Sequence, residues 1–172
     1  MTGGADCVRL LVPMKFEKLL IGKVEKWLVD EAKKVGLDID GFQHEITNEF
    51  AIHVLNRHGN EKGEASKGLI AIKEADFGNI PEIVKNPDYA IIGARRKNED
   101  FVIYAKKMSD GTTLYFEEVL RGRSNRTLRG KTMYKRKDDL DKEMFLNIVT
   151  NRDKTDVSNA QVVNRAEYPS TR

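Results

Sequence analysis

The chain has 172 residues, 40% of them hydrophobic, and this length suits one domain that buries roughly two-thirds of its unfolded surface. Cys7 is the only cysteine, which excludes an intrachain disulfide and a cysteine-rich zinc site. No stretch approaches the roughly 18 apolar residues of a membrane helix, and residues 1–13 lack the features of a signal peptide, so we expect no membrane segment and action in the cytoplasm.

The net charge of +3 is small, but the charges are unevenly placed. Residues 121–137 form a run of basic side chains, which we call the basic block. Such a run is typical of a solvated face and also of a surface that binds a polyanion, and both interpretations stay open on this feature alone. Between residues 121 and 137 every charged side chain is basic, and these side chains are Arg121, Arg123, Arg126, Arg129, Lys131, Lys135, Arg136 and Lys137.

The spacing of apolar residues predicts helices in the first part of the chain. Apolar residues recur with the helical period over residues 14–35, which predicts a long amphipathic helix. Residues 42–46 are expected to be extended. Thr47 or Asn48 can then cap a second helix that runs to about Arg57.

The second part of the chain reads mainly as strands. Residues 61–67 are polar and contain glycine, which predicts a loop, and residues 74–85 are expected to form a short helix. Helices followed by an antiparallel sheet make an α+β domain. The expected strands are residues 89–95, 100–108, 112–120 and 128–136.

The expected organisation is a single domain. Residues 14–148 form this domain, preceded by a flexible leader at residues 1–13. Residues 149–172 are expected to be a polar tail, because they contain few apolar side chains to bury.

The chain has only three histidines, His44, His53 and His58, and they lie close together in the sequence. Imidazole titrates near neutrality, so it can act as an acid or a base without a cofactor. His53 and His58 are five positions apart, which turns them about 140° from one another on a helix and does not form a chelating pair. We therefore expect no metal and no cofactor, and ordinary packing or surface histidines remain the alternative.

Several segments around these histidines resemble a known family, the phage and mobile-element branch of the barnase/EndoU/colicin/RelE-like nucleases, which is of the polymorphic-toxin type. The similar motifs follow one another over residues 41–136. They are Gly41-Phe42-Gln43-His44-Glu45-Ile46, the segment at residues 50–60, Ala65-Ser66-Lys67-Gly68, the segment at residues 76–88, Tyr115-Phe116-Glu117-Glu118-Val119 and Lys131-Thr132-Met133-Tyr134-Lys135.

The resemblance implies N-terminal helices followed by a four-stranded antiparallel sheet, with RNA cleaved on the open face of the sheet. It implies a metal-independent ribonuclease toxin, for which tRNA is the expected substrate and an acidic immunity or antitoxin protein the expected partner. Such toxins are delivered as the C-terminal part of a larger protein. The alternative is a catalytically inactive RNA-binding or interaction module on the same fold, for which the basic block would suffice.

Metal-free RNA cleavage needs a base for the ribose 2′-OH, an acid for the leaving 5′-oxygen and a cation for the charged phosphorane. His53 and His58 are the expected acid–base pair, and His44 is a third participant or an orienting partner. Cations and hydroxyl groups complete the expected catalytic set. These further residues are Lys67, Lys131, Thr132 and Tyr134, and the expected RNA-binding residues are Arg121, Arg123, Arg126, Arg129, Lys135 and Arg136.

Strand geometry limits this assignment. Alternation puts Lys131 on the face opposite to Thr132 and Tyr134, so all three line one site only if a bulge intervenes. We favour Thr132 and Tyr134 on the site-facing side, with Lys131 reaching round an edge. Lys67 stands where the family often has arginine, which keeps the charge and loses the bidentate fork. Glu118 shares a face with Phe116, which predicts burial beside a partner such as arginine, and a role as general base is the alternative.

Overall fold

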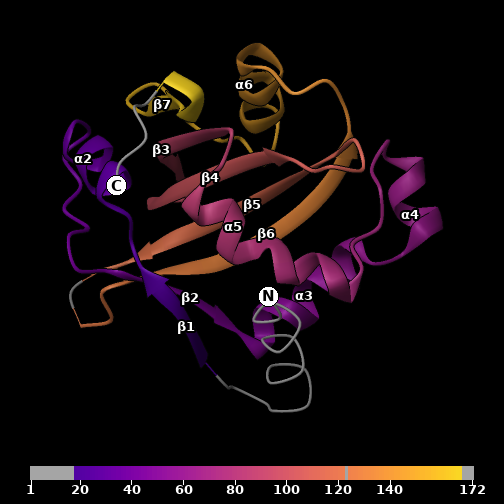
Figure 1. The fold of residues 1–172 in the computed structure, drawn as a ribbon, viewed down its shortest axis with the longest axis horizontal. Helices are drawn as coiled ribbons and strands as arrows, with labels where there is room; N and C mark the ends of the chain where they lie inside the picture. The colour runs from indigo at the N-terminus through magenta and orange to yellow at the C-terminus, as the bar shows by residue number, and fades with distance from the viewer. Residues whose placement is uncertain (1–17, 123, 168–172) are drawn as a thin grey trace.

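A computed structural model of the chain describes residues 18–122 and 124–167. The expected leader at residues 1–13 and Arg123 lie outside the described residues. Figure 1 shows a single twisted sheet with helices around it. The strands are β1 Lys18–Lys23, β2 Gln43–Thr47, β3 Tyr89–Arg96, β4 Glu99–Lys107, β5 Thr112–Arg121, β6 Thr127–Lys137 and β7 Gln161–Asn164.

Helices occupy the connections between these strands. The α-helices of the described residues are α2 Lys26–Lys33, α3 Asn48–His58, α4 Glu61–Ser66, α5 Ile80–Lys85 and α6 Lys142–Thr150. Two short 3₁₀ helices accompany them, η1 Glu74–Asn79 and η2 Arg165–Glu167.

The sheet is larger than the sequence predicts. Its order is β1-β2-β6-β5-β4-β3-β7, which makes seven strands among the described residues. The expected α+β class is confirmed, and the four expected strands are β3 to β6. The expected four-stranded antiparallel sheet that follows N-terminal helices is wrong, because β1 and β2 precede the meander, β7 follows it, and β2 pairs with β6 in parallel.

The predicted helix at residues 14–35 is the first correction. Its described part is the strand β1, antiparallel to β2, and then the short helix α2. Leu19 and Ile21 are half-buried and alternate with exposed neighbours, which is the period of a strand. Gly22 has a φ of 131°, next to a register shift, and a right-handed helix cannot continue through that conformation.

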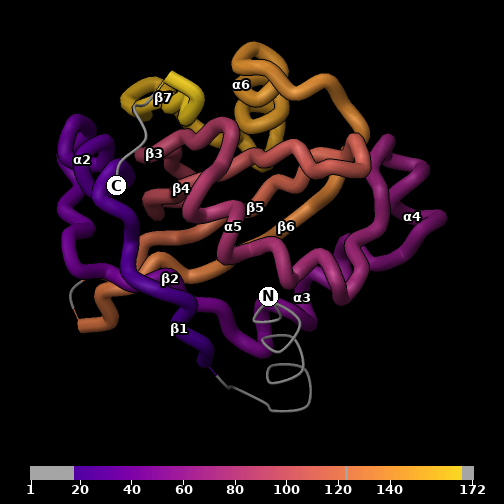
Figure 2. The backbone as a smooth tube through the Cα atoms, viewed as in Figure 1, coloured from indigo at the N-terminus to yellow at the C-terminus, as the bar shows by residue number. Residues whose placement is uncertain are grey.

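The expected polar tail is the second correction. Helix α6 extends to Thr150, and β7 then pairs antiparallel with β3 at the edge of the sheet, as Figure 2 shows. Val163 is buried there. β7 is held mainly by backbone hydrogen bonds to the open edge of β3. Such pairing needs few apolar side chains, so the amino-acid composition of residues 149–172 gives little sign of a strand.

The sheet separates two hydrophobic cores. On one face, which we call the α3 face, Phe116 packs with apolar side chains of α2, α3 and α5, and Figure 1 shows α5 crossing the central strands on this side. On the other face, the α6 face, Tyr115 and Tyr134 pack with Phe145 and Val149 of α6. Neighbouring residues of one central strand therefore serve different cores.

Helix α3 lies along β6 beyond the point where β2 stops pairing with that strand. β2 pairs with β6 only from Gln43 to Glu45, and α3 then packs against β6. The Thr47 hydroxyl caps α3 by accepting a hydrogen bond from the Phe50 amide at 3.0 Å, and Gly59 follows its last turn. This confirms the predicted second helix, with an end one residue beyond Arg57.

Loss of the Thr47 cap should weaken the fold. Thr47→Ala leaves the first turn of α3 with an unpaired amide, and we expect it to lower the free energy of unfolding by about 1 kcal/mol. Thr47→Ser keeps the hydroxyl and is the matched control. Urea unfolding followed by circular dichroism measures both variants, and equal stabilities would show that the cap contributes nothing.

Candidate active site

A cleft of about 610 Å³ opens on the α6 face, where α3 lies against β6. Six basic and three acidic side chains line it, so its charge suits an anionic ligand. The lining residues are His53, Arg57, His58, Arg96, Lys97, Glu99, Phe101, Glu117, Lys131, Thr132, Arg152, Asp153 and Lys154.

The structure brings four of the expected catalytic residues together, namely His53, His58, Lys131 and Thr132. Both β6 residues can face the cleft because the strand has a bulge. Glu117 pairs with Thr132, but the next residue of β5 pairs with Gly130, which leaves Lys131 as an extra residue. The bulge breaks the alternation that would put Lys131 and Thr132 on opposite faces.

Tyr134 lies beneath the cleft and does not line it. Its ring is stacked on that of Tyr115, with centroids 4.9 Å apart, and only 1% of the residue is exposed. The His58 ring centroid is 6.0 Å away, and the Arg152 guanidinium carbon lies 3.9 Å from the Tyr134 centroid. Burial raises the pKa of Tyr134, so the phenol stays neutral and its ring forms the floor under two functional groups.

His58 has the geometry of a general base. Its Nδ1 lies 2.9 Å from the Glu64 carboxylate, and because an ionised carboxylate only accepts, Nδ1–H donates and Nε2 keeps its lone pair. Burial lowers the pKa of His58 below its ordinary 6.5, although the hydrogen bond to Glu64 partly opposes it. The imidazole is therefore neutral near pH 7 and has a fixed tautomer.

Glu64 is a residue of the candidate site that the sequence did not reveal. It lies in α4, where residues 61–67 were expected to be a loop, and it is 1% exposed. Burial favours the neutral acid, but hydrogen bonds from His58 and Lys67 outweigh it and lower the pKa of Glu64. Asn60, which caps α4 through the Gly63 amide, is the sequence signal that could have revealed this helix.

Lys67 is not at the expected place. Its ammonium is 3.0 Å from the second oxygen of Glu64, and it does not line the cleft. The expected place of Lys67 in the cleft is therefore wrong, because its ammonium pairs with the carboxylate that His58 also contacts.

His53 is exposed on α3 and lines the same cleft. Partial burial lowers the pKa of His53, and the nearby basic groups Arg57, His58 and Lys131 lower it further. An anionic ligand would offset these charges and favour the protonated imidazole. His53 can therefore gain a proton when an anion binds in the cleft.

His44 is separated from the other two histidines. Its Nδ1 is 2.6 Å from Glu118 and its Nε2 3.2 Å from Glu25, and 1% of the residue is exposed. Glu117 lines the cleft, and Glu118, the next residue of β5, points to the opposite α3 face. The expected place of His44 in the site is therefore a correction: it is the buried partner of two carboxylates.

The carboxylates also set the charge of His44. Burial alone would lower the pKa of His44, but Glu118 and Glu25 raise it to about 10. Glu118 is buried as the sequence predicts, and its partners are His44 and the Tyr104 hydroxyl, at 2.6 Å, in place of the expected arginine.

Glu117 anchors the floor of the cleft and was also missed. It is fully buried and accepts two hydrogen bonds from the Arg96 guanidinium, at 2.5 and 3.1 Å. Arg96 Nε donates to the Thr155 hydroxyl at 2.6 Å. The signal in the sequence is alternation, since Glu117 lies between Tyr115 and Val119 on the α6 face.

The side chains of the basic block do not form one continuous surface of unpaired cations. Carboxylates pair with four of its eight cations, and only Lys131 of the block lines the cleft within the described residues. Arg126 donates to the Asp40 carbonyl at 2.8 Å. The ion pairs are Arg121 with Glu99, Arg129 with Glu45, Lys135 with Asp76 and Arg136 with Asp138. Binding of RNA by these residues stays a prediction.

Two further searches concern the ranges 18–122 and 124–167. In them no group of three or more His, Cys, Asp or Glu residues is arranged to hold a metal ion. The helices found there are all too short or too polar to cross a membrane.

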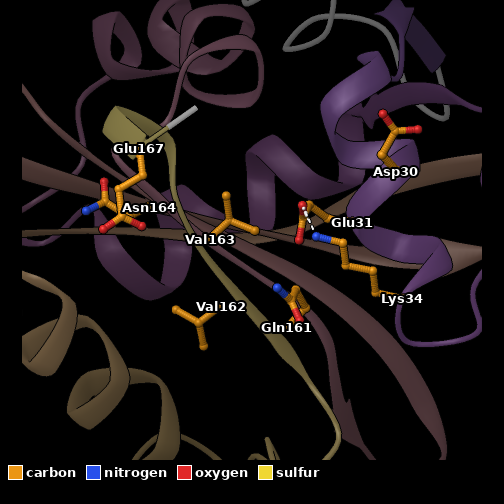
Figure 3. A pocket seen from close by; sticks show the side chains of 8 residues that line it. All are labelled: Asp30, Glu31, Lys34, Gln161, Val162, Val163, Asn164 and Glu167. Carbon is orange, nitrogen blue, oxygen red and sulfur yellow. Dashed lines mark hydrogen bonds and ion pairs between the residues drawn. The ribbon is translucent and has the colours of Figure 1, made fainter. Parts of the chain in front are cut away.

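A second hollow, of about 530 Å³, lies between α2 and β7 (Figure 3). Its charged lining is Asp30, Glu31, Glu167 and Lys34, and Lys34 is already paired with Glu31 at 2.8 Å. This hollow has no histidine and an excess of carboxylates, so it suits neither acid–base chemistry nor a polyanion. The histidine cleft is the candidate active site.

Comparison with protein families matches residues 22–143 to the family described as phage-Barnase-EndoU-ColicinE5/D-RelE like nuclease3. The chain belongs to this nuclease family. The family that the motifs resemble is thus confirmed. Searches of the curated proteins and of the solved structures found no significant match. The matched part of the nuclease contains His53, His58, Lys131 and Thr132, and it ends before Arg152.

The three histidines of the nuclease should titrate in separate pH ranges. His44 should stay protonated at pH 8, because its pKa is raised to about 10, whereas His53 and His58 should lose their protons below pH 6.5. Nitrogen-15 NMR of the imidazole rings measures each pKa, and His44→Gln, His53→Gln and His58→Gln assign the signals. A His58 pKa above 6.5 would contradict its neutral state.

Proposed function

We propose that this nuclease is a metal-independent endoribonuclease whose active site is the histidine cleft. The observation that carries the proposal is the pair formed by His58 and Glu64, which leaves a neutral Nε2 in a cation-rich cleft beside His53. An imidazole with a fixed tautomer and a lowered pKa is suited to remove a hydroxyl proton near pH 7.

The reaction follows from these groups. His58 Nε2 takes the proton of the ribose 2′-OH, and the 2′-oxygen forms a bond to the adjacent phosphorus. The bond from phosphorus to the 5′-oxygen breaks, and His53 gives its proton to that oxygen. Lys131 stabilises the charge of the phosphorane. The products are a 2′,3′-cyclic phosphate and a free 5′-hydroxyl, and DNA is not a substrate because it lacks the 2′-OH.

The family context supports a wider proposal. A toxin of this kind would act in the cytoplasm on tRNA, and an acidic immunity protein would neutralise it by meeting the basic cleft. Sequencing of RNA ends after brief expression in cells would identify the RNA and the bond that is cut.

Removal of the base should abolish most of the activity. His58→Ala should lower cleavage of total tRNA by at least about 100-fold, because the 2′-OH loses its proton acceptor. Asn56→Ala, an exposed change on the same helix, is the control. Near-parental cleavage by His58→Ala with an unchanged circular dichroism spectrum would remove His58 from the mechanism. RNA that the parent binds and leaves intact would favour the inactive module.

Glu64 should act as a positioning residue. The Glu64 carboxylate raises the pKa of His58, so Glu64→Gln should lower it further. The base must be neutral to act, and the acidic limb of the kcat/KM profile should therefore move to lower pH. The rate at the optimum should fall less than in His58→Ala. An unmoved limb would show that Glu64 only supports the fold.

Cleavage should survive chelators. The proposed acid, base and cation are all side chains, so EDTA should leave the rate unchanged and the products should carry a 2′,3′-cyclic phosphate. Gel analysis with mass spectrometry of the RNA ends checks both points. Loss of cleavage in EDTA with recovery in zinc or magnesium would overturn the mechanism.

A further inference from the structure

The loop at residues 151–156, directly after α6, forms one wall of the cleft. It contributes Arg152, Asp153 and Lys154 to the lining, and it lies beyond the part of the chain that matches the family. The sequence reasoning placed this loop in a polar tail and gave it no role.

The fold holds this loop in place. Arg95 and Asp156 exchange two backbone hydrogen bonds of 2.9 Å, which tie the loop to the end of β3. The Thr155 hydroxyl accepts from Arg96 and donates to the Arg152 carbonyl. Asp153 has a φ of 49°, in the left-handed region that side chains rarely adopt. Such conformations persist where the surroundings enforce them, and they cluster at ligand sites.

The Arg152 guanidinium lies in the cleft without a hydrogen bond. Among the described residues none accepts from it, and its nearest carboxylate oxygen, on Glu117, is 3.7 Å from its Nε. Arg96 differs, because its donors are used by Glu117 and Thr155. Glu117 is thus already neutralised by Arg96, and Arg152 is a surplus cation that lies over the Tyr134 ring.

Arg152 and His58 share this support. Both lie against the Tyr134 ring, and the charge of Arg152 contributes to the lowered pKa of His58. An anion bound to the free side of the guanidinium would therefore lie beside the imidazole. A guanidinium fork binds two oxygens of one phosphate with defined geometry, which a point charge does not do.

We propose that Arg152 is the phosphate-binding residue of the cleft, and that the loop at residues 151–156 positions an RNA phosphodiester beside His58. This inference rests on the proposed function and adds a binding subsite to it. Glu117 and Arg96 fix the floor on which the subsite is built, and the ligand is the phosphodiester anion itself.

The test separates binding from cleavage. The probe is a fluorescent 2′-O-methyl RNA oligonucleotide, which keeps every phosphate and cannot be cleaved by 2′-OH attack. Fluorescence anisotropy over a series of salt concentrations compares the parent, Arg152→Gln, Arg152→Lys and the control Lys142→Gln. Lys142 is exposed at the start of α6, outside the cleft.

Arg152→Gln should bind the probe about tenfold more weakly, as expected for a lost charged hydrogen bond, and its log–log salt slope should fall by about 0.7. Arg152→Lys should keep the slope and bind severalfold more weakly, because charge remains and the fork is lost. Lys142→Gln should bind like the parent. Parental affinity and slope in Arg152→Gln, or no binding by the parent, would overturn the subsite.

Parallel cleavage of unmodified RNA by the parent distinguishes the two proposals. If the parent cuts no RNA and Arg152→Gln still loses affinity, the subsite stands and the ribonuclease proposal fails. If the parent cuts RNA and Arg152→Gln binds normally, the reverse holds. Should Arg152→Gln not fold, Arg152→Lys decides: weaker binding with the same slope supports the subsite, and unchanged affinity overturns it.

Discussion

Glu117 and Glu118 follow one another on β5, the middle strand of the sheet, and both are fully buried. A carboxylate without a partner in such a place costs several kcal/mol, so each needs positive or hydrogen-bonding neighbours. Strand alternation sends the two side chains to opposite faces. Glu118 is met by His44 and Tyr104 on the α3 face, and Glu117 by Arg96 on the α6 face.

This constraint gives the two sides of the sheet different roles. On the α3 face the pairing is complete and sealed, so His44 is a fixed internal cation. On the α6 face the buried Glu117 is paired with Arg96, and this arginine lies at the sheet surface beside an open cleft. The polar groups there remain within reach of a ligand, because α6 covers only part of that face.

Two buried histidines of one chain thus differ in charge for simple reasons. His44 faces two carboxylates, and their attraction exceeds the cost of burial. His58 faces one carboxylate that Lys67 also binds, and there burial prevails. In the sequence these imidazoles look alike, and the charges that lie near each one in the fold give His44 a raised pKa and His58 a lowered pKa.

Local signals predicted much of the fold. The cap at Thr47 and the strands β3 to β6 were predictable because their signals lie in neighbouring residues. The two outer strands were missed because each depends on a distant partner. β1 carries adjacent leucines that fit a helical period as well as a strand. β7 has only four residues, two of them polar, and it is fixed by the backbone edge of β3.

The candidate site was predictable to the same extent. His53 and His58 are close in sequence and share a helix, so the sequence predicted that they lie near one another. For Lys131 and Thr132, the sequence predicted only that a bulge would be needed to bring them to one site. Glu64 follows His58 by six residues, in a helix whose cap at Asn60 was not recognised. Arg96 and Arg152 reach the site through tertiary contacts, and no spacing rule links them to the histidines. Three of the four ion pairs of the basic block also join residues that are far apart in the sequence.

Because the loop that carries Arg152 lies late in the chain, the walls of the cleft are synthesised in a fixed order. During synthesis, His53 and His58 leave the ribosome long before the strand β6 that supports them, and Arg152 follows later still. Each shorter nascent chain lacks a wall of the cleft. The histidines alone, without their floor and their cation, form no enclosed pocket, so the growing polypeptide presents no finished cleft to the nucleic acid around it until the segment after α6 has emerged.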